Sequence, residues 1–145
     1  MSAPNIERFN ALAGAIFAKL YEEFPVPVEL SAHDFADQMI ASDAPRFLDL
    51  RFFTSTVMWL GDHGYLSRGN TVSNGTVLNC SLTARALELL NALPSALENK
   101  GTSLGDELIS ATKEGLTGKV KELASDFLSK AVVFGAKAAT EWATS

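Results

Sequence analysis

The sequence predicts a mainly α-helical chain that carries one small β-hairpin. Over residues 5–24, 50–60 and 116–142 the apolar side chains recur every three or four positions, which is the spacing of one helical face. Between the second and third of these stretches lies Asn74-Gly75, a pair that tolerates the positive φ angles of a tight hairpin turn. We therefore expect helices on both sides of a hairpin.

Residues 5–24 form the first predicted helix, which carries a regular apolar face. The residues of this face are Ile6, Phe9, Ala13, Ile16, Phe17, Leu20 and Phe24. The helix should end at Pro25-Val26-Pro27, because proline lacks an amide donor and disfavours helical geometry in the residue before it. A short extended segment to Leu30 follows. Ser31 can cap a brief second helix, whose inward residues are Phe35, Met39 and Ile40.

A third helix is predicted from Pro45 to about His63, because proline fits a first helical turn and Gly64 follows as a stop. Its inward face consists of Leu50, Phe53, Val57 and Leu60. The hairpin begins at Tyr65-Leu66. In its second strand, alternation places one set inward (Leu78, Cys80 and Leu82) and the other outward (Val77, Asn79 and Ser81). Thr83 can cap a fourth helix that ends near Pro94.

The chain is predicted to divide into a first unit at residues 1–94, a linker at 95–103 and a helical segment at 104–145, with Ser103 and Asp106 at the start of the last. The apolar stripe of this segment has an eleven-residue period, which keeps its face aligned on a straight helix. Such a face must be covered by the first unit or by a second copy of the chain. We assign it to packing or oligomerisation and expect a homo-oligomer; its residues include Leu116, Val120, Leu123, Phe127, Phe134 and Trp142.

Two stretches of residues 5–94 resemble the winged helix-turn-helix family, and bacterial regulators in particular. The segment 56–66 is similar to the end of that family's recognition helix, where a leucine and then a glycine introduce the first wing strand. The segment 82–90 looks like the leucine-threonine opening of the helix after the wing. The resemblance implies a winged-helix domain followed by C-terminal helices, and a domain that binds a partner rather than transforming a substrate.

DNA-binding members of this family read the major groove with the third helix and contact the backbone with the wing. The corresponding residues here are Arg46, Arg51, Thr54, Ser55 and Arg68. However, residues 1–94 contain 6 basic against 10 acidic side chains, and the whole chain has a net charge of −5. Few cations are thus available to neutralise phosphates. A dimeric DNA-binding regulator is therefore the alternative hypothesis.

Four large apolar side chains of the third helix favour a protein partner instead. The inward stripe of this helix cannot hold all of Phe47, Phe52, Met58 and Trp59, so some should lie at its flanks or outside. Exposed aromatic and methionine side chains are enriched at protein interfaces. Burial of all four under neighbouring helices is the other interpretation. The first hypothesis is a protein-interaction module.

The sequence offers no pattern for catalysis or for a cofactor. His33, His63 and Cys80 show no metal-ligand spacing, and the scattered glycines form no phosphate-binding loop. We expect surface histidines, a small buried thiol, no metal and no enzyme activity. One cysteine and the lack of a signal-like or membrane-spanning apolar run favour a cytoplasmic protein without membrane contact. The alternating charges of the C-terminal segment also disfavour a membrane-surface helix.

Overall fold

The computed structural model describes residues 4–35, 50–72, 75–92 and 103–129. As expected, these residues form mainly helices with a small antiparallel sheet. The elements are α1 (Pro4–Glu23), β1 (Val28–Leu30), the 3-10 helix η1 (Ala32–Phe35), α3 (Leu50–Asp62), β2 (Leu66–Ser67), β3 (Val77–Leu82), α4 (Ala84–Ala92) and α5 (Leu104–Lys113). A further helix occupies residues 117–129. No helix in the described parts is both long and apolar enough to cross a bilayer.

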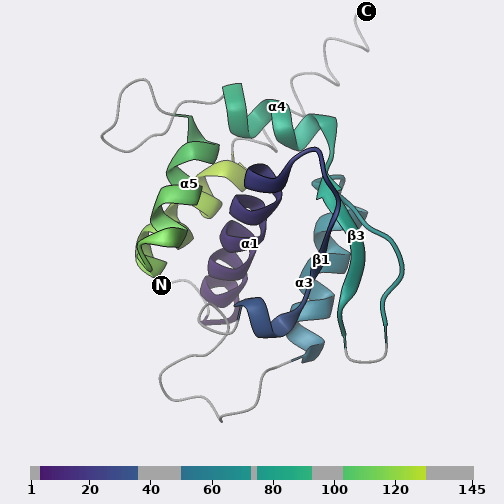
Figure 1. The fold of residues 1–145 in the computed structure, drawn as a ribbon. Coiled ribbons are helices and arrows are strands. Elements are labelled where there is room, and N and C mark those ends of the chain that lie inside the picture. Colours follow the sequence, from purple (N-terminus) through teal and green to yellow (C-terminus); the bar gives the residue numbers. More distant parts are fainter. Residues whose placement is uncertain (1–3, 36–49, 73–74, 93–102, 130–145) are drawn as a thin grey trace, which may run out of the picture.

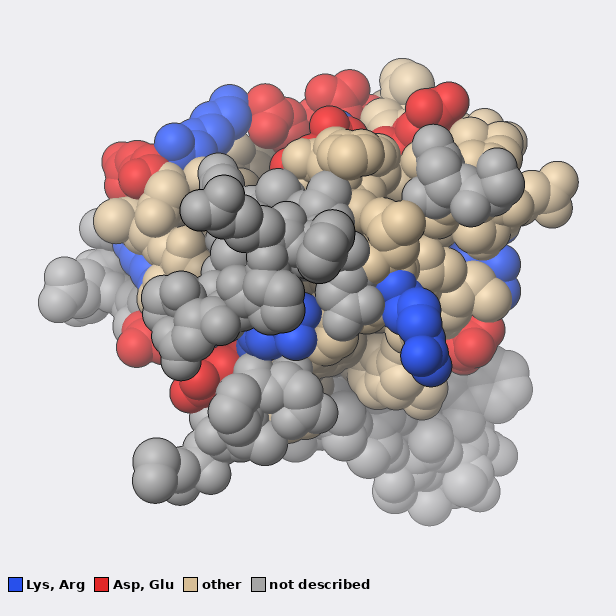
Figure 2. Space-filling model, turned by 90° about the horizontal axis from the view of Figure 1, so that it is seen from below, with Lys and Arg blue, Asp and Glu red and all other residues tan. Residues whose placement is uncertain are grey.

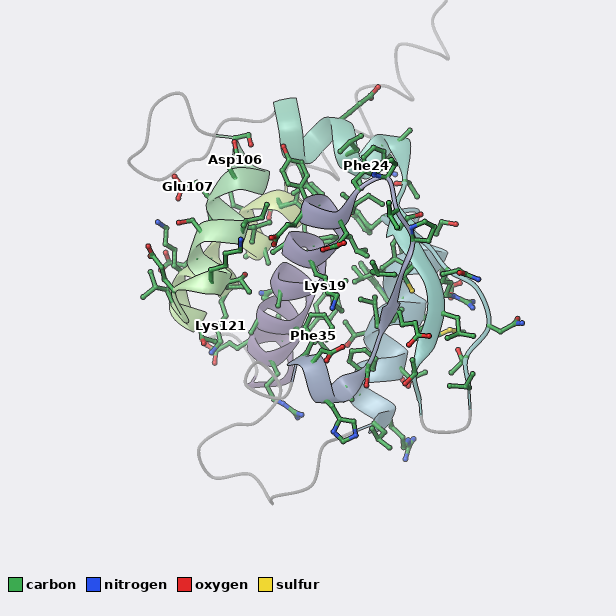
Figure 3. The ribbon with its side chains drawn as sticks, viewed as in Figure 1. Lys19, Phe24, Phe35, Asp106, Glu107 and Lys121 are labelled. Carbon is green, nitrogen blue, oxygen red and sulfur yellow. The ribbon has the colours of Figure 1, made fainter. Side chains whose placement is uncertain are left out.

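Helix α1 lies at the centre of the molecule (Figure 1). Helix α5 covers one side of it, α3 and the sheet cover the other, and α4 lies beyond its C-terminal end. Every residue from 11 to 18 with a side chain is therefore buried, whichever way it points. The ends of α1 extend past these neighbours: Ile6 is 48% exposed, and Phe24, beyond the last turn, is 39% exposed (Figure 3). The expectation that both face inward was wrong, because none of the described neighbours fully covers these two side chains.

The sheet has three antiparallel strands in the order β1-β3-β2, one strand more than the expected hairpin. The extended segment before Leu30 supplies the additional strand β1, which pairs with β3. Strand β2 pairs with the other edge of β3, and Thr71 bridges to Val77 nearer the turn. Gly75 has a φ of +86°, as a tight turn requires, although its predicted partner Asn74 lies outside the described residues.

A bulge in β3 changes which side chains face inward. On β1 Val28 and Leu30 are two residues apart, whereas their partners Cys80 and Val77 are three apart, so β3 contains one extra residue. Asn79, inside this stretch, has a φ of +54°. An extra residue reverses the alternation beyond it. Cys80 and Leu82 are buried as predicted, but Val77 is buried and Leu78 half-buried, the reverse of the expected order.

Two of the predicted helix starts, at Thr83 and Ser103, are confirmed by hydrogen bonds. Thr83 Oγ1 accepts the amide of Ala86 at 3.1 Å, and the Thr83 hydroxyl donates to the carbonyl of Gly64 at 2.7 Å. Ser103 Oγ accepts the amide of Asp106 at 3.2 Å and caps α5. The bonds from Ala86 and Asp106 satisfy amides that the first helical turn leaves free.

Two predicted inward faces need correction. On α3, Phe53, Val57 and Leu60 are buried as predicted, but Leu50 is 41% exposed at the first turn of the helix. The described part of the predicted second helix is the short η1, whose Phe35 is buried and stacks on Phe53 at 5.8 Å between ring centroids. Met39 and Ile40 lie outside the described residues.

Buried residues between 104 and 127 belong to the same hydrophobic core as the first unit. Two glycines let α5 and the 117–129 helix approach α1 closely: a Cβ on Gly14 would lie 2.6 Å from Val120 Cγ1, and a Cβ on Gly105 would lie 2.8 Å from the Tyr21 ring. Lys119 Nζ also lies 3.1 Å from the buried Glu107 carboxylate, which joins the 117–129 helix to α5. Both helices therefore dock on α1 by close packing, and the ion pair joins them to each other.

This packing determines how much of the predicted oligomerisation stripe is available to another chain. Val120, Leu123 and Phe127 are buried within their own chain, so they present no surface for self-association while the helix is docked. Leu116 is 44% exposed, and Phe134 and Trp142 lie outside the described residues. The described part of the stripe is intramolecular core from Val120 onward.

Candidate functional site

An apolar hollow lies between the first turns of α1 and the outer face of α3. It has a volume of about 340 Å³. We call it the α1–α3 groove; its walls are Ile6, Phe9, Phe52, Ser55, Thr56 and Trp59. Two of these side chains are well exposed, Ile6 at 48% and Trp59 at 40%. The groove therefore presents large apolar groups to solvent.

Helical spacing explains how each wall is built. Ile6 and Phe9 are three residues apart on α1, and Phe52, Thr56 and Trp59 follow one another by four and three residues on α3. Residues at these intervals share one face of a helix. On α3 this face adjoins the buried stripe, so the helix is apolar over more of its circumference than its core contacts require. The surplus forms one wall of the groove.

Trp59 is held by three aromatic neighbours. Its ring meets Phe9 edge-on at 5.3 Å, lies nearly parallel to Tyr65 at 6.0 Å and stacks on His63 at 3.9 Å between centroids. His63 Nδ1 also lies 2.9 Å from the carbonyl oxygen of Trp59. An indole fixed on several sides loses little conformational entropy when a partner covers the rest of it. Trp59 is therefore a preorganised contact.

The polar groups of Arg8 and Thr56 near Phe52 already have contacts within the protein, so the floor of the groove is apolar. The Arg8 guanidinium lies 4.3 Å from the centre of the Phe52 ring, which links α1 to α3 across the groove. The Thr56 hydroxyl donates to the carbonyl oxygen of Phe52 at 2.8 Å, so it is already satisfied within the helix. Ser55 is exposed and leaves a hydroxyl at the rim. An apolar ligand would thus meet few polar groups that need a new partner.

The structure brings together half of the predicted partner-binding residues. Phe52 and Trp59 line the groove, while Met58 is half-buried on α3 and is not among the lining residues. Phe47 lies outside the described residues. Sequence reasoning missed Ile6 and Phe9, which it placed in the core. No sequence signal distinguishes them, because they have the same spacing as the buried residues that follow.

The residues predicted for DNA contact differ in their exposure and in their contacts. Arg51 and Ser55 are exposed on α3, but the Thr54 hydroxyl donates to the carbonyl of Gly75 at 3.3 Å. Arg68 lies 3.9 Å from the Asp62 carboxylate, and its side chain is 29% exposed. Arg46 lies outside the described residues. Figure 2 shows Lys and Arg in separate groups on one face, with Asp and Glu among them.

The structure places Cys80 inside the fold and both histidines at its surface. Burial raises the pKa of Cys80 to about 11, although the charge of nearby Arg68 opposes the shift. The thiol therefore stays protonated near neutral pH. His33 and His63 are exposed, as expected. Within the described ranges no three His, Cys, Asp or Glu side chains gather in a way that could hold a metal ion.

Comparison of the chain with protein-family models, with curated proteins and with solved structures finds no significant match.

Proposed function

We propose that residues 5–94 form a winged-helix domain. Support comes from the order of the described elements, in which α1 and β1 precede α3, and β2, β3 and α4 follow it. The antiparallel order β1-β3-β2 places the predicted wing strands next to the strand after α1, an arrangement compatible with this family. The helix before the wing is then α3, which carries one wall of the groove.

The function that we propose is non-catalytic binding of a protein through the α1–α3 groove. The observation that carries it is the exposure of Trp59 and Ile6 on either side of an apolar hollow. Tryptophan is enriched among the residues that dominate binding energy at protein interfaces. The hollow has room for a few large side chains, as an amphipathic helix presents at intervals of three or four residues. The expected partner is therefore a helix with an apolar face.

Photo-crosslinking tests this proposal in the cells that make the protein. A photo-reactive amino acid replaces Ser55 at the rim of the groove, and a control chain carries it at Glu29, an exposed residue of β1. We expect a discrete product with another protein from position 55 that is absent from position 29. Ile6→Asp should abolish the product, since it places a charge beside the apolar wall. Identical products from both positions would contradict the proposal.

The DNA-binding alternative makes an opposite prediction for the same chain. A regulator that neutralises phosphates loses duplex affinity steeply as salt is raised. Submicromolar duplex binding with that salt dependence, lost in Arg51→Ala with Arg68→Ala, would favour the alternative. The pairing of Arg68 with Asp62 and the use of Thr54 in a turn contact argue against it. We therefore expect no such binding.

A further inference from the structure

We propose that the helix that binds in the α1–α3 groove carries acidic residues along the edges of its apolar face, and that Arg8 and Arg51 select it. The inference rests on the proposed function for its site and adds the charge of the partner. The apolar walls of the groove leave that charge open. Three observations on the described residues support the inference.

The first observation is that two arginines, one from each helix, adjoin Phe52 at one end of the groove. The Arg8 guanidinium of α1 lies 4.3 Å from the centre of the Phe52 ring. Arg51 directly precedes Phe52 on α3 and is exposed. It also lies four residues before Ser55 of the rim, and residues four apart are neighbours on a helix surface. A helix in the groove would therefore lie beside positive charge.

The second observation is that the nearest carboxylates are turned to other parts of the surface. Over the first turns of α1 and along α3, the acidic side chains are Glu7 and Asp62. Glu7 lines a different, polar hollow between α1 and the 117–129 helix. Asp62 lies 3.9 Å from the Arg68 guanidinium, which offsets its charge. The described rim of the groove is thus locally positive, although the whole chain has a net charge of −5.

The third observation is the length of the groove. Along α3 its wall runs from Phe52 to Trp59, which is about 10 Å at roughly 1.5 Å per residue. This length matches two turns of a partner helix, whose apolar residues recur every three or four positions. The residues that flank this apolar stripe would then lie against the rim. Carboxylates there would meet opposite charge, whereas ammonium groups would be repelled.

Two synthetic peptides test the inference with the purified full chain. Both carry leucines at intervals of three and four residues, and the flanking positions are glutamate in one peptide and lysine in the other. Fluorescence anisotropy of a terminal dye measures the Kd of each. At about 0.1 M salt the glutamate peptide should bind about fivefold tighter, as exposed charge pairs allow. At about 1 M salt the Debye length is about 3 Å, and the difference should vanish.

The net charge of the chain makes this comparison discriminating. Non-specific attraction to a chain of net charge −5 would favour the lysine peptide. A preference for the glutamate peptide therefore requires local positive charge. Equal binding of the two peptides to the wild type, or tighter binding of the lysine peptide, would overturn the inference.

Charge reversal shows whether the rim causes the preference. Arg51→Glu should remove the preference or reverse it, and the fold should persist because this side chain is exposed. Lys113→Glu is the matched control, since it makes the same change of charge on α5, on the other side of α1 (Figure 1). It should keep the preference, and thermal melting checks that both variants fold. A preference that survives Arg51→Glu, or that Lys113→Glu removes equally, would contradict selection by the rim.

The crosslinker at Ser55 keeps this inference distinct from the proposed function. If neither peptide binds but the crosslinked product with a partner forms, the acidic helix is wrong and the binding function stands. If that product is missing as well, both fail. Light scattering of the purified chain from about 1 to 100 μM measures self-association. A dimer that Ile6→Asp dissociates would overturn the inference in favour of a second copy in the groove.

Discussion

The two sides of α1 contrast in how their apolar side chains are used. On one side, α5 and the 117–129 helix approach closely at Gly105 and Gly14, and a Glu107–Lys119 ion pair joins them. On the other side, near its first turns, α1 and α3 leave an open groove lined by Phe9 and Trp59. The same helical apolar pattern thus produces core on one side and surface on the other.

The difference shows that the neighbours of an apolar face, and not its hydrophobicity, decide whether the face is buried or exposed. Ile16 and Ile6 are the same residue type on the same helix, yet Ile16 is fully buried and Ile6 is 48% exposed. Close-packed contacts lock the covered side. Large apolar groups that are exposed together on a protein surface usually mark a binding site. The closed side therefore holds the fold, and the open side is the candidate for function.

Phe127→Ala should produce the largest loss of stability. Its ring is fully buried against Phe17 and Tyr65 at 4.8 and 5.9 Å between centroids. Removal of a buried phenylalanine side chain costs about 3–5 kcal/mol. Urea denaturation of the full chain measures the loss, and Leu116→Ala, on the exposed part of the stripe, should cost far less. Similar losses for the two variants would show that the C-terminal helix does not close this side.

Gly14→Leu should lower the free energy of unfolding by about 3 kcal/mol, because the added side chain has no room between α1 and the 117–129 helix. A Cβ at this position already lies 3.2 Å from Ala124 Cβ and 3.1 Å from the Val120 carbonyl oxygen. Gly118→Ala is the control, since nothing lies within 4 Å of an added Cβ there. Thermal melting of both variants checks the prediction. A neutral effect at Gly14 would contradict the close helix contact.

The free energy of unfolding should depend on pH because of Cys80, which lies on the sheet side of the core. Its pKa rises from 9.0 to about 11 on folding, so the folded chain holds this proton more tightly than the unfolded chain. The resulting stability is fully present below pH 9 and is lost as the pH rises through 11. Between pH 9 and 10 the loss should be about 1 kcal/mol. Chemical denaturation of the wild type and Cys80→Ala measures it; parallel pH profiles would contradict a dry site.

The sequence predicted most helices and the caps at Thr83 and Ser103, because helical spacing and capping act over a few neighbouring residues. It did not predict the bulge at Asn79, the pairing of β1 with β3 or the close contacts at Gly14. Those depend on partners far along the chain. The bulge alone exchanged the environments of Val77 and Leu78.

The candidate site was only partly predictable for the same reason. Phe52 and Trp59 could be identified because one face of α3 was already filled by its core stripe. Ile6 and Phe9 have the same spacing as the buried residues after them, and only the positions of neighbouring elements show that the cover ends there. The pairing of Arg68 with Asp62 likewise needed the fold.

The central claim is that Trp59 serves binding more than it serves the fold. The direct test is the yield of the Ser55 crosslink to a partner in Trp59→Ala and in Leu116→Ala, each with its free energy of unfolding. Both side chains are exposed to a similar extent, 40% and 44%. We predict that Trp59→Ala reduces the yield by about tenfold for a stability loss of about 1 kcal/mol, whereas Leu116→Ala leaves the yield unchanged. An unchanged yield in Trp59→Ala, or a loss of stability as large as that of Phe127→Ala, would contradict the claim.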